Sequence, residues 1–260
     1  MAVVQTLYSG SSGNCTLIRD SGTALLVDMG KSCKETVTAL LAAGVSHSEL
    51  SGILLTHEHS DHIAGLGVFL KRHPVPLFGP SAVLEYLYVN KLVPECDLVE
   101  IEPHTDLMLG GVTFTAFRTS HDSHDCYGYR FLFDDGRSAA IATDLGHVSE
   151  QVMNQLSGCD LVGLESNYDK GMLRYGPYPA YLKRRIASKN GHLSNDDCAE
   201  TFAKLALKGA GKFILMHLSE ENNAPDVALT TCLSALENCG AEGSVVEVAP
   251  RHCAGAALEV

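Results

Sequence analysis

The segment Thr56-His-Glu-His-Ser-Asp-His62 concentrates side chains that bind metal ions. It holds three histidines and two acids, and it follows the apolar run Ile53-Leu-Leu55 directly. Imidazole and carboxylate groups suit Zn²⁺, Mn²⁺ and Fe²⁺, whereas a structural zinc site usually includes thiolates. A metal site with open coordination positions can activate water. The segment therefore predicts a catalytic metal centre.

The spacing within this segment divides its ligands between two ions. Alternate side chains of an extended chain point the same way, so His57 and His59 can bind one ion while Glu58 points away from both. Asp61 and His62 come where the chain turns into a helix, so they face elsewhere and can serve a second ion. The spacing is therefore typical of a dinuclear site.

Four more polar residues directly follow expected strands: His121, Asp144, Glu165 and His217. Because the ends of neighbouring strands lie side by side at one edge of a sheet, these residues can converge with the first segment. His124 is an alternative to His121. Asp144 is alternatively a helix cap, although a carboxylate behind a buried strand is unfavourable without a cation.

The elements that position these residues fall into two similar halves. Alternating apolar residues and turn residues predict the strands, and helical spacing predicts the helices. Two halves of this kind indicate a sandwich of two sheets with helices outside. The expected strands are 3–8, 15–19, 23–28, 52–56, 112–118, 127–134, 137–143, 160–165 and 212–216, and the expected helices are 31–43, 65–70, 149–156, 179–188, 195–208 and 225–238.

Composition limits the class of protein. A chain of 260 residues with 45% hydrophobic content and no low-complexity linker predicts one domain over residues 1–260. Nine scattered cysteines, none at C-x-x-C spacing, disfavour a disulfide framework and fit a reducing cytoplasm. The sequence has neither a signal-peptide pattern nor an apolar run near the ~20 residues that span a bilayer, so we expect a soluble cytoplasmic protein without a membrane partner.

The segment Thr56–His62 resembles the signature of the metallo-β-lactamase-fold hydrolases, and the likeness extends over almost the whole chain. This resemblance implies an α/β fold, a four-layer αββα sandwich that binds two divalent ions, Zn²⁺ or Mn²⁺, with Fe²⁺ also compatible. The ligands it implies are His57, His59 and His121 for one ion, Asp61, His62 and His217 for the other, and Asp144 as a bridge between them.

The second half of the chain resembles the phosphodiesterases of this fold. Leu164–Asn167, Gly191–Asn195 and Ile214–Asn223 are similar in order and spacing to segments of the tRNase Z group. Together with Ser9–Cys15 they resemble the YycJ/WalJ branch, whose members are regarded as 5′ to 3′ exonucleases on DNA. One departure is Tyr168, which stands where this branch has a histidine, so no proton transfer is assigned to it.

The resemblance implies roles for three residues in phosphodiester cleavage. Asp61 would orient a hydroxide activated by the two metal ions, and His192 would give a proton to the departing sugar oxygen. Glu165 would orient or charge His192. The alternatives are a capping position for His192 beside Ser194 and an indirect role for Glu165.

Several polar residues are expected to contact the substrate, and DNA is favoured over RNA. The first group is Ser12, Asn14, Ser194, Ser219, Asn222 and Asn223. Because the net charge is −12, nucleic-acid binding needs a local basic patch. Six lysines and arginines between Lys170 and Lys189, interleaved with tyrosines at 175, 178 and 181, could provide phosphate contacts and stacking faces. The alternative is an ordinary solvated helix face.

Other functions of the fold remain open at this point. An RNA-processing or small-molecule phosphodiesterase shares the same chemistry. A thioester hydrolase of the glyoxalase-II kind or a lactamase is disfavoured by the paired Gly-His-Leu-Ser and His-Leu-Ser segments. A non-catalytic scaffold would lack some ligands, and all seven residues of the expected set are present.

Overall fold

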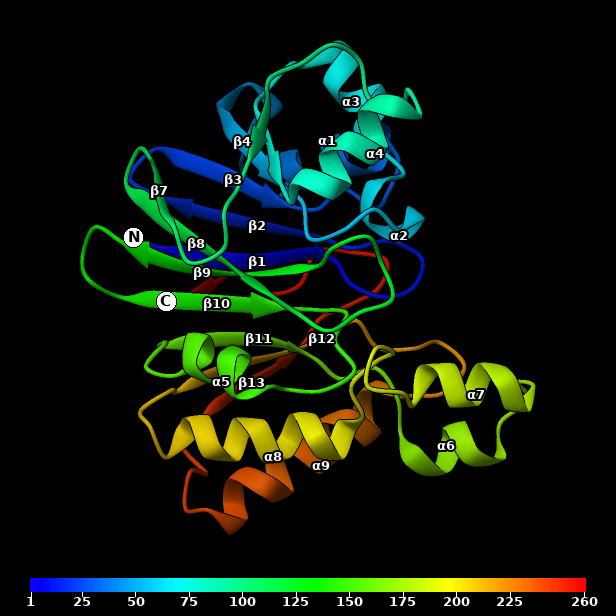
Figure 1. Cartoon of the computed structure of the whole chain (residues 1–260). Helices are drawn as coiled ribbons and strands as arrows, with labels where there is room; N and C mark the ends of the chain where they lie inside the picture. Colours follow the sequence, from blue (N-terminus) through cyan, green and yellow to red (C-terminus); the bar gives the residue numbers. More distant parts are fainter.

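The computed structural model describes residues 1–260 and contains two seven-stranded sheets (Figure 1). The strands at the start of the first sheet are antiparallel, and those from β3 onward are parallel. In spatial order this sheet contains β14 (Leu258–Glu259), β1 (Val3–Tyr8), β2 (Cys15–Asp20), β3 (Thr23–Val27), β4 (Leu50–Leu54), β5 (Leu77–Gly79) and β6 (Leu98–Glu100).

The second sheet repeats this plan with the second half of the chain. Its members from β7 to β10 are antiparallel, and those from β10 to β13 are parallel. In spatial order it contains β13 (Val245–Val248), β12 (Lys212–Met216), β11 (Leu161–Glu165), β10 (Ser138–Ala142), β9 (Tyr127–Phe133), β8 (Val112–Arg118) and β7 (Asp106–Leu109).

Helices cover the outer face of each sheet and complete four layers (Figure 1). The first sheet packs against α1 (Cys33–Ala42), α3 (Leu66–Arg72) and α4 (Ser81–Val89), and the second packs against α5 (Glu150–Leu156), α8 (Asn195–Ala206) and α9 (Pro225–Asn238). A third apolar cluster lies between the sheets and takes side chains from both. This shared core supports our proposal that residues 1–260 fold as one domain.

Local sequence explains where the main helices begin. Ser32 and Glu35 form a reciprocal capping box at the start of α1, and Ser194 accepts a hydrogen bond from the backbone N–H of Asp197 at the start of α8. Such caps satisfy amide groups that have no partner within the helix. The short helices α2 (Ser60–Ile63), α6 (Lys170–Tyr175) and α7 (Ala180–Ile186) lie at the edge toward which the parallel strands run (Figure 1).

Strand register brings the functional segments to this edge. In the first sheet Val27 pairs with Leu54, so the residues after β3 and β4 leave the sheet together. In the second, Ala142 pairs with Leu164, and Glu165 pairs with Met216. The chain positions after β10, β11 and β12 therefore lie side by side, as the sequence predicts.

The four-layer sandwich confirms the predicted fold class, and most expected elements are present within one to three residues. The strand expected at 52–56 is β4, at Leu50–Leu54, because Leu55 and Thr56 already turn toward the metal-binding segment. The sequence did not predict β5, β6, β7, β13 and β14, which have two to four residues each, nor α4 and α6.

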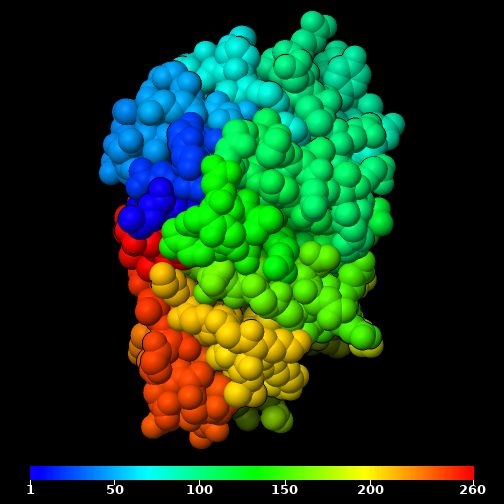
Figure 2. All heavy atoms as spheres, turned by 90° about the vertical axis from the view of Figure 1, so that its left-hand side faces the viewer, coloured from blue at the N-terminus to red at the C-terminus, as the bar shows by residue number.

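The chain ends lie on the side away from α6 and α7 (Figure 2). The last strand, β14, pairs antiparallel with β1. All nine cysteines are free, which confirms the expected absence of disulfides. None of the helices has both the length and the apolar composition that a membrane crossing requires.

Candidate metal centre

Three histidines from two loops form the first half of the centre. His57 and His59 follow β4, and His121 follows β8; one ring nitrogen from each lies within 4.8 Å of the others. The rings of His57 and His59 are 4.6 Å apart and nearly perpendicular, and those of His57 and His121 are 5.0 Å apart. This geometry leaves space between the rings for one ion, as the alternation within the motif predicts.

A second group lies beside the first. Asp61, His62 and His217 also bring one ligand atom each within 4.8 Å of one another. Asp144 lies between the groups: its Oδ1 atom is 3.6 Å from His121 Nε2 and 3.4 Å from His217 Nδ1. The structure therefore brings all seven predicted ligands together, with Asp144 at the position expected of a bridge.

Hydrogen bonds to Nδ1 orient several of these rings. Nδ1 of His62 is 2.7 Å from Asp28 Oδ2, Nδ1 of His121 is 3.0 Å from the Gly191 carbonyl, and Nδ1 of His217 is 2.8 Å from Glu165 Oε1. Each contact leaves Nε2 directed at the cluster. Metal-binding histidines characteristically hold their second ring nitrogen in this way, which fixes the tautomer.

Unpartnered buried atoms provide an independent test of metal binding. His57 Nε2 and Asp144 Oδ2 are buried without a hydrogen bond of good geometry, although His62 Nε2 lies 3.1 Å from Asp144 Oδ2. Such atoms are unfavourable unless a ligand satisfies them. Burial would raise the pKa of Asp144, but His217 and His62 outweigh burial and hold it well below the usual range, so the carboxylate stays ionised. An ionised acid among imidazole nitrogens fits a divalent cation.

Three residues at this edge have left-handed backbone conformations. The φ angles are 62° for Asp28, 55° for Asp144 and 54° for His217. Each residue directly follows a parallel strand, at the point where the chain must turn sharply. Non-glycine residues rarely adopt this region, and strained backbone of this kind gathers at functional sites.

Asp28 is a functional residue that the sequence analysis did not single out. It is buried and accepts hydrogen bonds from the Thr56 backbone N–H and hydroxyl, at 2.8 Å each. Its contact with His62 makes it the residue that orients this ring. The signal was available, because Asp28 is an acid directly behind the buried strand Thr23–Val27, as Asp144 is behind β10.

We expect Asp28→Asn to weaken metal binding about 10- to 100-fold, because an amide cannot accept from both Thr56 and His62 as the carboxylate does. Competition with a chromophoric chelator measures the change. Asp134→Asn, at an exposed acid, is the matched control. Equal metal affinity in the two variants would contradict the role assigned to Asp28.

Glu165 connects the second half of the centre to His192. Its side chain is completely buried, and Oε1 lies 2.7 Å from His192 Nδ1 as well as 2.8 Å from His217 Nδ1. Oε2 accepts from the backbone N–H groups of Leu145 and Leu193 at 3.0 Å. Burial alone would lower the pKa of His192, but Glu165 outweighs burial and raises it, which favours the protonated ring.

The loop Ser9–Asn14, expected to contact substrate, lines the cavity at the centre with Ser11, while its other residues pack against the ligands or face away. Asn14 is buried, and its Nδ2 lies 3.3 Å from Asp61 Oδ2 and 3.1 Å from His62 Nε2. Ser9 Oγ accepts from the backbone N–H of His217 at 2.8 Å. Ser12 is exposed and contacts Lys31. Asn14 therefore supports the ligand residues from behind, whereas the sequence analysis expected it to contact the substrate.

The remaining expected substrate contacts are mostly buried. Ser194 is the N-cap of α8 and is fully buried, so its hydroxyl is used within the fold. Asn223 bonds to the carbonyls of Ser166 and Asn167, which holds the loop after β11. Asn222 Oδ1 is buried without a partner. Ser219 alone of these residues lines the cavity at the centre.

That cavity, of about 240 Å³, has one wall made by α7 and by Tyr178 in the loop before it. Tyr178, Arg185 and His192 line it together with the metal-binding residues. Half of the basic residues between Lys170 and Lys189 have local partners: Lys170 lies 3.3 Å from Asp196, Arg185 forms an ion pair with Asp122, and Lys183 donates to backbone carbonyls. The segment therefore builds part of a wall and also presents some free positive charge.

The structure shows the positions of Tyr168 and His124, whose roles the sequence analysis left undecided. Tyr168 is buried against Leu173 and Ile186, and burial, with a smaller contribution from Asp197, raises its pKa to about 12. It secures α6 and α7 and lies in their small apolar core. His124 is not in the first metal group, because its Nδ1 pairs with Glu58 Oε1 at 2.7 Å.

Comparison with known proteins agrees with the fold and the centre. Residues 23–218 match the β-lactamase superfamily domain. The structure of the metallo-β-lactamase fold protein YhfI from Bacillus subtilis superposes with a TM-score of 0.75 and 22% identity, covering 98% of this chain and 99% of that one. The chain belongs to the β-lactamase superfamily, and it is a metal-dependent hydrolase that binds divalent ions.

Two more similar sequences define its place within the superfamily. Exodeoxyribonuclease YycJ of Bacillus anthracis is 35% identical over 237 residues, which cover 90% of this chain and 89% of the relative. Exodeoxyribonuclease WalJ of Streptococcus pneumoniae is 35% identical over 233 residues, covering 88% and 86%. The chain is therefore a member of the YycJ/WalJ family.

Proposed function

We propose that the protein is an exodeoxyribonuclease that degrades DNA from 5′ to 3′ with two divalent ions, Zn²⁺ or Mn²⁺. The observation that carries this proposal is the position of His192 beside the seven clustered ligands, with its Nδ1 at 2.7 Å from Glu165 Oε1. Hydrolysis of a phosphodiester releases an alkoxide that needs a proton, and this arrangement supplies one. The names of the two relatives support DNA as the substrate.

The seven proposed ligands are His57, His59, Asp61, His62, His121, Asp144 and His217. Two bound divalent ions would lower the pKa of a water molecule and offset charge on the phosphate. Asp61 lines the cavity and is partly exposed there, so it can accept a hydrogen bond from the attacking water. The water is thereby directed at phosphorus.

His192 completes the reaction from another wall of the cavity. Its Nδ1 is engaged by Glu165, so the proton that moves to the departing sugar oxygen is the one on Nε2. Glu165 stays ionised, because its pKa is lowered: burial opposes this, and His192 outweighs burial. The carboxylate stabilises the charged ring before the transfer and orients it.

Nine free cysteines support the cytoplasm as the compartment.

Substrate preference tests the proposal. Purified protein with Mn²⁺ or Zn²⁺ is incubated with 5′-labelled and 3′-labelled duplex DNA, single-stranded DNA, RNA, bis-p-nitrophenyl phosphate and a glutathione thioester. We expect the 5′ label to be released at once in the smallest product, while the 3′-labelled strand shortens step by step.

Three other results of this assay would change the proposal. Release of the 3′ label first would reverse the polarity, and faster cleavage of RNA would reassign the substrate. Thioester turnover without phosphodiester cleavage would overturn the nuclease assignment altogether. Asp144→Asn protein prepared in parallel excludes contaminating nucleases.

A further inference from the structure

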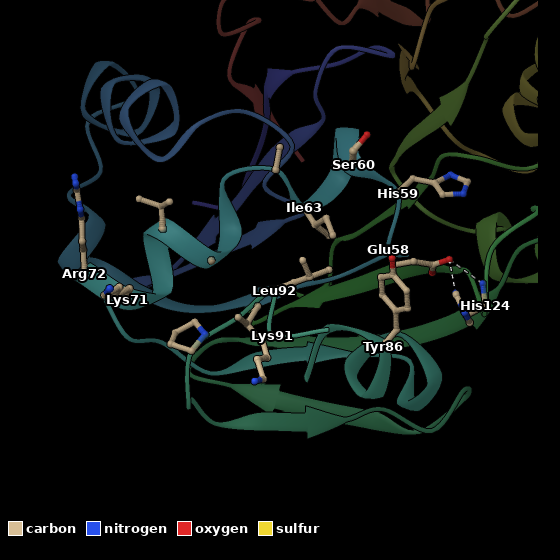
Figure 3. A pocket seen from close by; sticks show the side chains of 15 residues that line it. Glu58, His59, Ser60, Ile63, Lys71, Arg72, Tyr86, Lys91, Leu92 and His124 are labelled. Carbon is tan, nitrogen blue, oxygen red and sulfur yellow. Dashed lines mark hydrogen bonds and ion pairs between the residues drawn. The ribbon is translucent and has the colours of Figure 1, made fainter. Parts of the chain in front are cut away.

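A second and larger hollow opens beside the metal centre (Figure 3). This groove has a volume of about 1270 Å³ and lies between the motif after β4, the helices α2 and α3, and α4 with the loop after it. His59 lines both the groove and the smaller cavity that contains His192. The two hollows therefore meet at the metal centre, and a long substrate can occupy both.

Three cations line the end of the groove that is remote from His59. They are Lys71 and Arg72 at the end of α3 and Lys91 after α4, named here the groove cations (Figure 3). All three are exposed, and none forms a side-chain hydrogen bond or an ion pair within the chain. In a protein with a net charge of −12, three unpaired cations along one hollow are a local positive patch.

The groove cations differ in this respect from the basic segment that the sequence emphasised. There, Lys170 and Arg185 pair with acids, and Lys183 donates to the Arg174 and Gly176 carbonyls. A cation that is already paired gains less from a phosphate, because the existing partner must be displaced. Arg174, Arg184 and Lys189 of that segment form no ion pair either, but they line neither hollow, whereas the groove cations lie together in one.

The end of the groove nearest the metal centre offers different chemistry. The rings of Tyr86 and His124 are 4.9 Å apart and inclined by 34°, and His124 is exposed (Figure 3). Glu58 accepts from His124 through Oε1, and its buried Oε2 has no partner. Aromatic faces stack on unpaired bases, so this end of the groove suits a base more than a phosphate.

The geometry points to this groove as the binding track for a single DNA strand that continues from the cleaved phosphodiester. The strand's phosphates contact the groove cations, and its bases stack against Tyr86 and His124. The inference rests on the proposed function for the identity of the strand. A nucleotide bound in the smaller cavity and a strand bound in the groove would together place one bond at the metal centre.

Fluorescence anisotropy of a labelled 15-nucleotide DNA strand tests the track. The His192→Ala background limits degradation, and divalent metal is present throughout. We expect the triple variant K71A/R72A/K91A to bind about 10- to 100-fold more weakly in ~0.1 M salt, and the slope of log affinity against log salt to fall by about 2. The control K34A/K204A/K208A removes three exposed lysines elsewhere and keeps its affinity and salt slope.

A second variant and a kinetic measurement keep the test decisive. K71R/R72K/K91R retains the charge and should restore binding, which separates loss of charge from loss of folding. With His192 present, the triple variant should lose at least about 10-fold more activity on the 15-nucleotide strand than on bis-p-nitrophenyl phosphate.

The outcomes distinguish the two proposals. Unchanged affinity and salt slope in the triple variant would overturn the track, whatever the enzyme cleaves. If the unaltered protein does not cleave DNA, while the triple variant still binds the strand more weakly than the control variant, only the exonuclease assignment is overturned. Equal losses on the long and the small substrate would place the effect at the metal centre and also contradict the track.

Discussion

His192→Ala should lower kcat on DNA about 100- to 10,000-fold while metal content stays unchanged. The reason is that His192 is not one of the seven proposed ligands, although it lies beside Asp144 and His217, and Glu165 raises its pKa, which favours the proton needed by the departing oxygen. A p-nitrophenolate group departs without a proton. The same variant should therefore lose far less activity on bis-p-nitrophenyl phosphate.

The comparison between the two substrates is the decisive measurement. His252→Ala removes an exposed histidine and serves as the control. Equal losses on DNA and on the nitrophenyl ester would give His192 a positioning role. Undiminished DNA hydrolysis, with full metal content, would show that the proton comes from elsewhere.

Asp144→Asn should abolish measurable activity, with a loss of at least about 1,000-fold on every substrate. Asp144 is the carboxylate nearest both groups, and its Oδ2 is buried without a hydrogen bond of good geometry. An amide removes the negative charge that faces His62, His121 and His217, so both ions should bind more weakly. Metal analysis by mass spectrometry after gel filtration measures this loss directly.

Asp97→Asn, at an exposed acid distant in sequence from the centre, is the control for metal lost during gel filtration. Retention of both ions together with loss of activity would restrict Asp144 to a role in chemistry. Retention of both activity and metal would remove it from the centre.

The fold was predictable because its longest elements carry strong patterns. The buried runs of β10, β11 and β12 alternate with helices whose starts are marked by residues such as Ser194. The missed strands are too short for periodicity to appear, and they form because longer neighbours supply backbone partners. For β5 the neighbours are β4 and β6, which align its three residues in parallel.

The metal centre was predictable for a related reason: each ligand lies in a segment that follows a predicted strand. The supporting contacts were less visible, because Asp28 and Asn14 act through His62 and only the folded chain brings them together. Groove cations were missed because Lys71 and Lys91 lie on separate elements. A dense run such as 170–189 attracts attention in sequence, yet Lys170, Arg185 and Lys183, half of its basic residues, already have local partners.

The left-handed backbone at Asp28, Asp144 and His217 lowers thermal stability but is needed for catalytic activity. Each such conformation costs about 1–2 kcal/mol in a residue with a side chain, and glycine would adopt it freely. Glycine, however, would delete the ligand or the residue that orients one. Laboratory evolution for heat resistance alone should therefore discard these three residues early, while selection that also demands catalysis must retain the strain and seek its gains elsewhere in the chain.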